Sequence, residues 1–199
     1  MFQKAFKISL VALIGLGIVA GTTGCSGNDP LASQYRSGDN KNYISGDGTV
    51  TEFAIANRGQ SVTWSGVTES GEKLQSSNLA GVPVVMNFWY AGCAPCRAEA
   101  PDLLALAAEF QTQNVQFIGV NVRDTAQTAQ AFDRNFGMTY PSIIDNNSGS
   151  VLLAFTGIVT PQAVPTTLVI DREGRVSARI LGRIEKGTLK ALIKTAATE

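Results

Sequence analysis

The stretch VVMNFWYAGCAPCRAEAP, residues 84–101, decides the fold of this chain. Its first six residues form a mostly apolar run, typical of a strand that is buried on both faces. The residues from Arg97 onward predict a helix, so Cys93 and Cys96 fall at a strand-to-helix junction. The unpaired backbone N–H groups and the positive dipole end of a helix favour a thiolate at its N-terminus. The stretch therefore predicts a reactive dithiol, suited to disulfide exchange.

The N-terminal residues 1–24 have the pattern of a signal peptide. Lys4 and Lys7 precede an uncharged, mostly apolar stretch over residues 8–20, and small residues then lead to Cys25. An h-region of a signal peptide has roughly 7–15 residues, whereas a membrane-spanning helix needs about 20 apolar residues. Disulfides persist outside the cytoplasm and rarely within it. The sequence thus predicts an exported protein that faces the extracytoplasmic side.

Residues 21–25, GTTGC, predict how the exported chain is held at the membrane. They resemble the lipobox of bacterial lipoproteins, in which a cysteine after small residues is lipidated and begins the mature chain. Thr22 stands where that motif usually has leucine. We expect Cys25 to carry lipid and to attach the protein to the cell membrane. The alternatives are cleavage by an ordinary signal peptidase and an unpaired cysteine.

The composition limits the partners and the number of domains. The chain has 16 basic and 16 acidic residues, and residues 1–24 hold two of the lysines and no acid, so the mature chain carries a net charge of −2. This charge gives no electrostatic basis for binding nucleic acid. Residues 26–48 are rich in Gly, Ser, Asn and Asp. We therefore expect a flexible tether over 25–48 and one domain over 49–199.

Three cysteines and the absence of histidine narrow the chemistry of the site. If Cys25 carries lipid, Cys93 and Cys96 are the remaining thiols. Zinc needs about four ligands, usually Cys and His, so we expect no metal site, and a Cys–His catalytic pair is excluded. Haem attachment needs histidine directly after the second cysteine, where this chain has Arg97. No cofactor is expected, and a purely structural disulfide is the alternative for the pair.

Strand and helix signals alternate along the predicted domain. Short strands at 49–55 and 61–67 are expected to form an N-terminal hairpin, with Asn57-Arg58-Gly59 as its turn. The further expected elements are a helix after the dithiol, strands at 84–89 and 115–122, a helix from Asp124 to Gly137, an extended segment at 140–144, a short helix at 148–155, a hairpin of 166–170 and 176–181, and a C-terminal helix. This order predicts an α/β sandwich with a mixed central sheet flanked by helices.

Two segments carry a family resemblance. Residues 87–101, NFWYAGCAPCRAEAP, are similar to the active-site segment of thioredoxin-like proteins of the TlpA/ResA/DsbE group. Residues 164–174, VPTTLVIDREG, are similar to the cis-proline loop and the hairpin of that group. The order of elements matches over about residues 50–197. The resemblance implies a thioredoxin-like sandwich with an N-terminal β-hairpin extension, acting as a thiol-disulfide oxidoreductase.

The resemblance also implies roles for individual residues. Cys93, expected to be the more exposed thiol, would attack a partner disulfide, and Cys96 would resolve the mixed disulfide. Pro165 would be cis and lie opposite the dithiol, while Val164 would offer backbone hydrogen bonds to an extended substrate. Glu99 would accept or relay the proton of Cys96. The alternative for Glu99 is a solvated residue that stabilises the first turn of the helix.

The expected partners are exported proteins with thiols or disulfides and a membrane redox protein that recycles the dithiol of a monomer. Relatives act in cytochrome c maturation or in disulfide-bond formation, and Ala94-Pro95 does not settle the direction of electron flow. Gly92 stands where many relatives have tryptophan. One alternative is a thiol peroxidase, which commonly has threonine where this chain has Tyr90. Another is a non-catalytic lipoprotein that serves as a binding module with a structural disulfide.

Overall fold

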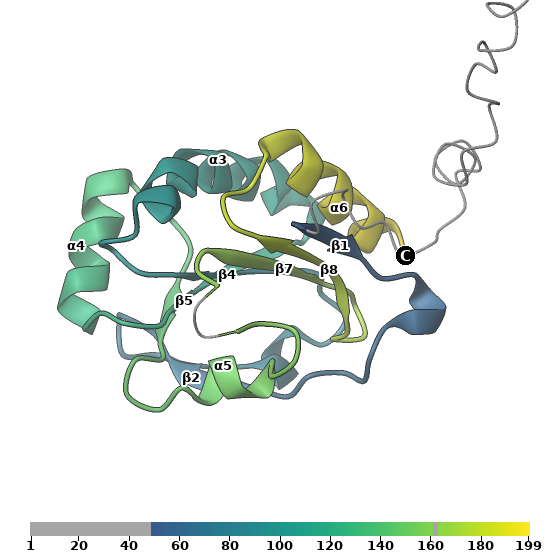
Figure 1. The fold of residues 1–199 in the computed structure, drawn as a ribbon, viewed down its shortest axis with the longest axis horizontal. Coiled ribbons are helices and arrows are strands. Elements are labelled where there is room, and N and C mark those ends of the chain that lie inside the picture. Colours follow the sequence, from purple (N-terminus) through teal and green to yellow (C-terminus); the bar gives the residue numbers. More distant parts are fainter. Residues whose placement is uncertain (1–48, 161–162) are drawn as a thin grey trace, which may run out of the picture. The chain divides into compact units, whose positions relative to one another are not determined.

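The computed structural model describes residues 49–160 and 163–199 (Figure 1). The predicted signal peptide over 1–24, the tether over 25–48 and the lipidation site Cys25 lie outside the described residues. Within the two described ranges, no helix is both long enough and apolar enough to cross a membrane.

A six-stranded mixed sheet forms the centre of the fold. Its strands are β1 (Val50–Glu52), β4 (Val84–Trp89), β5 (Gln116–Asn121), β6 (Ser142–Ile144), β7 (Thr166–Ile170) and β8 (Val176–Leu181). They lie in the order β1-β8-β7-β4-β5-β6. Strands β4, β5 and β6 are parallel, whereas β7, β8 and β1 join in antiparallel pairs. Every residue of the central strands β4 and β7 is buried, as a strand covered on both faces requires.

Helices cover both faces of this sheet. They are α3 (Ala94–Phe110), α4 (Ala126–Phe136), α5 (Ser150–Ala154) and α6 (Lys186–Thr198), with short 3₁₀ turns η1 (Ile55–Asn57), η2 (Ser76–Leu79) and η3 (Gln111–Gln113). Crossovers between parallel strands are nearly always right-handed, which places α3 and α4 on the same face. Figure 1 shows α6 on that face as well, and α5 on the opposite one. The predicted α/β sandwich with a mixed sheet and flanking helices is confirmed.

Apolar side chains fill the space between the sheet and each helical layer. On the α3 and α6 side, Leu106, Phe110 and Ile193 are fully buried in one cluster. On the other side, Phe88 and Phe155 meet edge to face, with ring centroids 6.0 Å apart. Burial of a large apolar side chain stabilises a fold by about 1.5–3 kcal/mol, so these two layers hold the sheet between them.

The N-terminal hairpin forms from different strands than expected. Strand β1 pairs with β8 at the edge of the main sheet, and β2 (Ser65–Val67) pairs with β3 (Lys73–Gln75) in a separate two-stranded sheet. The expected pairing of 49–55 with 61–67 is therefore wrong. An isolated hairpin is marginally stable in water, whereas β1 gains the edge of a large sheet. The hairpin β2–β3 is supported by close packing, because a Cβ at Gly66 would lie 2.3 Å from the Ile143 side chain.

The start of α4 also differs from the expectation. Thr125, not Asp124, caps the helix, and its hydroxyl accepts a hydrogen bond from the Thr128 N–H at 3.3 Å. The Asp124 carboxylate instead accepts the Ala91 N–H at 2.6 Å. The C-terminal end is as predicted, because Gly137 ends the helix with a left-handed φ of 70°. Asp124 thus binds the loop before Cys93 and does not cap the helix.

Arg58 lies in the segment that was expected to be a hairpin turn, and it anchors that segment to the domain. Its Nη1 is 3.0 Å from Asp171 Oδ2 and 2.6 Å from Glu199 Oε2. Its Nε donates to the Phe53 carbonyl at 3.0 Å. The side chains of Arg58 and Asp171 are 2% and 1% exposed, so the two opposite charges pair in a place that water does not reach. Asp171 has a second cationic partner, Arg175, which is 26% exposed.

We expect Arg58→Ala to lower the free energy of unfolding by about 3 kcal/mol, because it leaves the buried Asp171 carboxylate without its main partner. Arg175→Ala removes a more exposed partner of the same carboxylate and should cost about 1 kcal/mol or less. Urea titration of both variants measures the difference. Equal losses of stability for the two variants would contradict the anchoring role of Arg58.

Candidate active site

Cys93 and Cys96 form a disulfide at the start of α3. Their Cα atoms are 5.2 Å apart. Cys93 is the N-cap residue of the helix, and its Sγ accepts a hydrogen bond from the Cys96 N–H at 3.1 Å. Pro95 occupies the first turn, where a missing N–H costs no intrahelical bond. A helix N–H and the positive dipole end stabilise negative charge on sulfur, so this position favours Cys93 as the thiolate of the reduced pair.

Both cysteines are buried in the disulfide form. Each is 3% exposed, so the expectation that Cys93 is the more exposed of the two is wrong for this state. The reason is an apolar cluster around the pair, which includes the buried rings of Trp89 and Phe132, 4.4 Å apart between centroids. Val164 packs against the same cluster. The surroundings of the pair are thus apolar and shield it from water.

The loop that carries Val164 and Pro165 lies next to the dithiol. The peptide bond between these two residues is cis, as the resemblance implies. The Pro165 carbonyl accepts the Gly182 N–H at 2.8 Å, which ties the loop to the end of β8. Val164 reaches the cluster around Cys93 and Cys96. The structure therefore brings together two segments that are about 70 residues apart in the chain.

Glu99 is completely buried on α3, three residues after Cys96. Its Oε1 accepts a hydrogen bond from Asn87 Nδ2 at 2.8 Å, and its Oε2 accepts the Ile184 N–H at 3.0 Å. Burial raises the pKa of the Glu99 carboxyl to about 7, although these two hydrogen bonds lower it. A solvated glutamate at this position, the alternative interpretation, is wrong. A carboxyl that changes charge near neutral pH is suited to proton transfer.

Asn87 is a site residue that the sequence analysis did not single out. It is the polar residue of the otherwise apolar strand β4, and it is 5% exposed. Its Nδ2 also donates to Thr167 Oγ1 at 3.0 Å, across the β4–β7 pairing. Buried amides are normally hydrogen-bonded, so a lone amide in a buried strand is a signal for such a partner. Here the partner is Glu99.

The loop before Cys93 is held by the loop after β5. Besides the Ala91–Asp124 bond, Asp124 Oδ2 accepts from Asn121 Nδ2 at 2.9 Å, and the Arg123 guanidinium lies 4.1 Å from the centre of the Tyr90 ring. A cation over an aromatic face contributes about 0.5–1 kcal/mol at an exposed site. These contacts position the segment that presents the first cysteine, and none of them was predicted from sequence.

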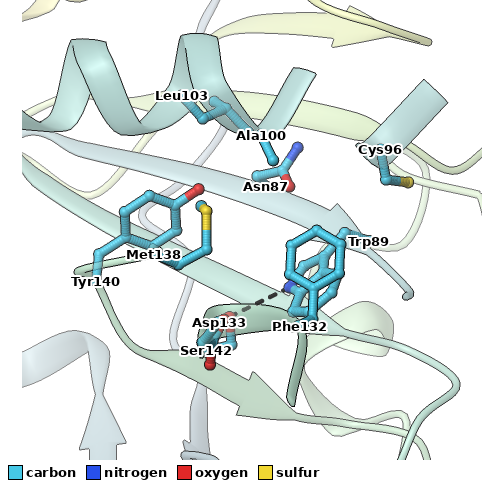
Figure 2. A pocket seen from close by; sticks show the side chains of 10 residues that line it. All are labelled: Asn87, Trp89, Cys96, Ala100, Leu103, Phe132, Asp133, Met138, Tyr140 and Ser142. Atoms are coloured by element: carbon cyan, nitrogen blue, oxygen red, sulfur yellow. Dashed lines mark hydrogen bonds between the residues drawn. The ribbon is translucent and has the colours of Figure 1, made fainter. Parts of the chain in front are cut away.

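A small cavity lies beside the buried cysteine, with room for about one water molecule. Figure 2 shows residues from β4, α3, α4, the segment before β6 and the first residue of β6 around it. Those with polar or sulfur atoms include Asn87, Cys96, Asp133, Met138, Tyr140 and Ser142. Among the residues that the structure describes, no group of three or more Cys, Asp or Glu side chains is placed to hold a metal ion.

A family model gives the affiliation of the chain. The model of the AhpC/TSA family matches residues 56–179, which include the dithiol and the cis-proline loop. The chain belongs to the AhpC/TSA family. This family is thioredoxin-like, in agreement with the fold described above.

Relatives of known name are thiol-disulfide oxidoreductases. The chain is 34% identical over 120 residues to thiol-disulfide oxidoreductase ResA of Geobacillus thermodenitrificans, which covers 60% of this chain and 66% of that protein. It is 30% identical to ResA of Bacillus subtilis, with 60% and 64% covered. The chain thus matches a little less than two thirds of the length of these relatives. The resemblance to the TlpA/ResA/DsbE group is confirmed.

Solved structures agree with this affiliation. A secreted thiol-disulfide isomerase from Corynebacterium glutamicum superimposes with a TM-score of 0.72 at 28% identity, over 79% of this chain and 98% of that one. A DsbF homologue from Corynebacterium diphtheriae has a TM-score of 0.68, also at 28% identity, over 77% of this chain and 96% of that chain. The structural neighbours have the thioredoxin fold.

The raised pKa of Glu99 makes folding stability depend on pH. The Glu99 carboxyl titrates near 4.5 in the unfolded chain and near 7 in the folded one, so its protonation stabilises the fold. This contribution to the free energy of unfolding is fully present below pH 4.5 and is lost as the pH rises through 7. We expect wild-type stability to fall relative to that of Glu99→Gln by up to about 3 kcal/mol between pH 4.5 and 8. Denaturant titrations of the oxidised proteins across this range measure the difference.

The control for this prediction is Glu72→Gln, an exposed carboxylate outside α3. This variant keeps Glu99 and should show the pH dependence of the wild type. A difference between wild type and Glu99→Gln that stays constant from pH 4.5 to 8 would contradict the shifted ionisation.

Proposed function

We propose that this chain is an extracytoplasmic protein thiol-disulfide oxidoreductase that exchanges disulfides with exported proteins. The observation that carries the proposal is the Cys93–Cys96 disulfide at the N-terminus of α3, where Cys93 Sγ accepts a helix N–H. The adjacent Val164-Pro165 loop and the names of the relatives support it. A crosslink with a purely structural role has no need of a helix N-terminus.

The proposed reaction with a partner disulfide has two steps. The Cys93 thiolate attacks one partner sulfur, an S–S bond forms between them, and the other partner sulfur leaves as a thiolate that takes up a proton. Cys96 then loses its proton and attacks Cys93 Sγ, which restores the Cys93–Cys96 disulfide and releases the second partner thiolate. Two electrons pass from the dithiol to the partner. The reverse sequence oxidises a partner dithiol.

In this reaction the neighbouring groups have separate tasks. Glu99 exchanges the proton of Cys96, which lies three residues earlier on α3 and is also buried. Val164 offers its backbone groups to an extended partner segment beside the dithiol, and Pro165 keeps this loop against the cluster. The apolar surroundings of the cysteines keep water away while the mixed disulfide exists.

The N-terminal region defines where the reaction takes place. Residues 1–24 act as the signal peptide, Cys25 carries the lipid that attaches the protein to the cell membrane, and residues 25–48 form a flexible tether. The domain over 49–199 acts as a monomer. A membrane redox protein recycles the dithiol, and the substrates are exported proteins in cytochrome c maturation or in disulfide-bond formation.

We expect purified wild-type protein to exchange with glutathione buffers and Cys93→Ser to lose this exchange completely. Cys96→Ser should keep the attacking thiol and accumulate a mixed disulfide, because the second step needs Cys96. Mass spectrometry after acid quenching measures the adducts. Trapping with Cys96→Ser in cells then identifies the partners, and their redox states give the direction of electron flow.

The same experiment separates the other two candidate functions. A binding module with a static crosslink is indicated if the disulfide resists reduction unless the protein unfolds. A thiol peroxidase is indicated if the reduced protein consumes hydrogen peroxide much faster than a free thiol does. We expect neither outcome, because Tyr90, three residues before Cys93, has its ring under Arg123 rather than a small hydroxyl beside the sulfur.

We expect Cys25→Ser to release the protein from the membrane fraction, because the variant lacks the thiol that receives the lipid. Expression of the full chain in a bacterium, with labelled palmitate and cell fractionation, measures this. Cys96→Ser is the matched control and should remain labelled and membrane-bound. Membrane attachment of Cys25→Ser equal to that of wild type would contradict lipid anchoring.

A further inference from the structure

The two groups that must exchange protons in the proposed reaction have almost no access to solvent. Cys96 is 3% exposed and Glu99 is not exposed at all. The proton of Cys96 leaves when the thiolate forms, and it must return when the pair is reduced. A buried carboxyl can hold this proton but cannot pass it to bulk water by itself. The reaction therefore needs a path through the protein.

The cavity beside Cys96 is lined by polar atoms that make no hydrogen bond to the residues that the structure describes. Asn87 uses its Nδ2 for Glu99 and Thr167, while its Oδ1 accepts no hydrogen bond from a described residue. The Tyr140 hydroxyl and the Asp133 carboxylate also make no hydrogen bond to the described residues, and all three side chains line the cavity. Buried polar groups normally have partners. A water in this cavity would satisfy them.

A water molecule can reach Asn87 Oδ1 and the Tyr140 hydroxyl. Among the described residues, Asn146 Oδ1 and Arg179 Nε are the side-chain atoms that are both inaccessible to solvent and without a hydrogen-bond partner. Asn87 Oδ1 and the Tyr140 hydroxyl are not among these atoms, although neither makes a hydrogen bond to a described residue, so both are accessible. Figure 2 shows the Tyr140 hydroxyl directed inward, among the lining residues. The space holds about one water, which typically makes two to four hydrogen bonds.

The cavity connects the inside of the site to its surface. At its inner end lie Cys96 and Asn87, whose Nδ2 is 2.8 Å from Glu99 Oε1. Asp133 of α4 also lines the cavity and is half-buried, whereas Cys96 and Asn87 are buried. Tyr140 contributes a hydroxyl that can both donate and accept a hydrogen bond. The lining of the cavity thus includes the buried thiol and a carboxylate that is only half-buried.

The charges around the cavity favour proton exchange near neutral pH. Burial raises the pKa of Asp133 to about 6, with Glu69 adding to the shift and Arg134 opposing it. Burial also raises the pKa of Tyr140, and the charges of Glu99 and Asp133 raise it further. The Glu99 carboxyl, which also faces Arg183 and Asp102, titrates near 7. Protons pass readily between groups of similar pKa, such as Glu99 and Asp133, whereas Tyr140 stays neutral and can relay a proton only by accepting one hydrogen bond while donating another.

We infer that Asp133 and Tyr140, with one water in the cavity, form a path for protons between Cys96 and solvent. In the resolving step, the Cys96 proton moves to Glu99 or to the cavity water, and an equivalent proton leaves through Tyr140 and Asp133. The S–S bond to Cys93 forms at the same time, and the departing partner thiolate takes its proton from solvent. Asp133 and Tyr140 are positioning residues, and this inference rests on the proposed function.

The test measures the resolving step by itself. Reduced full-length protein in detergent is mixed with saturating oxidised glutathione, and the decay of the Cys93 mixed disulfide is followed by acid quenching between pH 5 and 9. We expect Asp133→Asn and Tyr140→Phe to slow this decay on the order of tenfold near pH 6–7. Formation of the mixed disulfide should be unchanged. Glu72→Gln, an exposed carboxylate away from the cavity, is the control and should follow wild type.

A small buffer distinguishes a proton path from a structural effect. Added imidazole should restore the resolving rate of Asp133→Asn, because it carries protons to the mouth of the cavity in place of the carboxylate. Wild-type pH profiles for both variants, or slow decay that imidazole does not restore, would overturn the inference while the proposed function stands. If wild-type protein forms no mixed disulfide with glutathione, the proposed function fails and this inference fails with it.

Discussion

The buried carboxyl of Glu99 holds together the elements on which the site depends. Through Asn87 it is tied to β4, and through the Ile184 N–H to the segment between β8 and α6. Asn87 extends the network to Thr167 of β7. The helix that carries both cysteines is thereby attached to the two central strands at one point. Loss of this contact would leave one N–H of the Asn87 amide and the Ile184 N–H buried without partners, which costs about 1–3 kcal/mol for each.

The same contact sets the chemistry beside the dithiol. Water solvates an ionised carboxylate far better than a protein interior does, and two hydrogen bonds do not compensate fully, so the pKa of Glu99 rises to about 7. Ionisation of Glu99 at neutral pH therefore lowers the stability of the fold, and the same shift gives the site a group that changes its charge near neutral pH. Such a conflict between folding and ionisation is typical of functional sites. It places a carboxyl that changes its charge near neutral pH three residues after Cys96 on α3.

The dithiol itself is positioned by local and distant contacts of different kinds. The N-terminus of α3 supplies the N–H that Cys93 Sγ accepts, and this is a property of the local sequence. The loop before Cys93 is held by Asp124, which lies 33 residues beyond Ala91. The cis-proline loop, which leads into β7, packs Val164 against the apolar cluster that contains the pair. The surroundings of the two sulfur atoms therefore depend on two loops that lie outside α3.

The sequence by itself determined the order of elements, the strand 84–89, the hairpin of 166–170 and 176–181 and the dithiol at a helix start, because periodicity, turn residues and capping are local properties. Only the tertiary structure decided the partner of β1, the burial of Cys93, and the contacts of Asn87 and Asp124. These depend on competition between segments far apart in the chain. Several segments compete to form an edge strand, to cover an apolar surface or to make a buried hydrogen bond, and the one that lowers the free energy of the fold most takes that place. No local sequence pattern specifies this outcome.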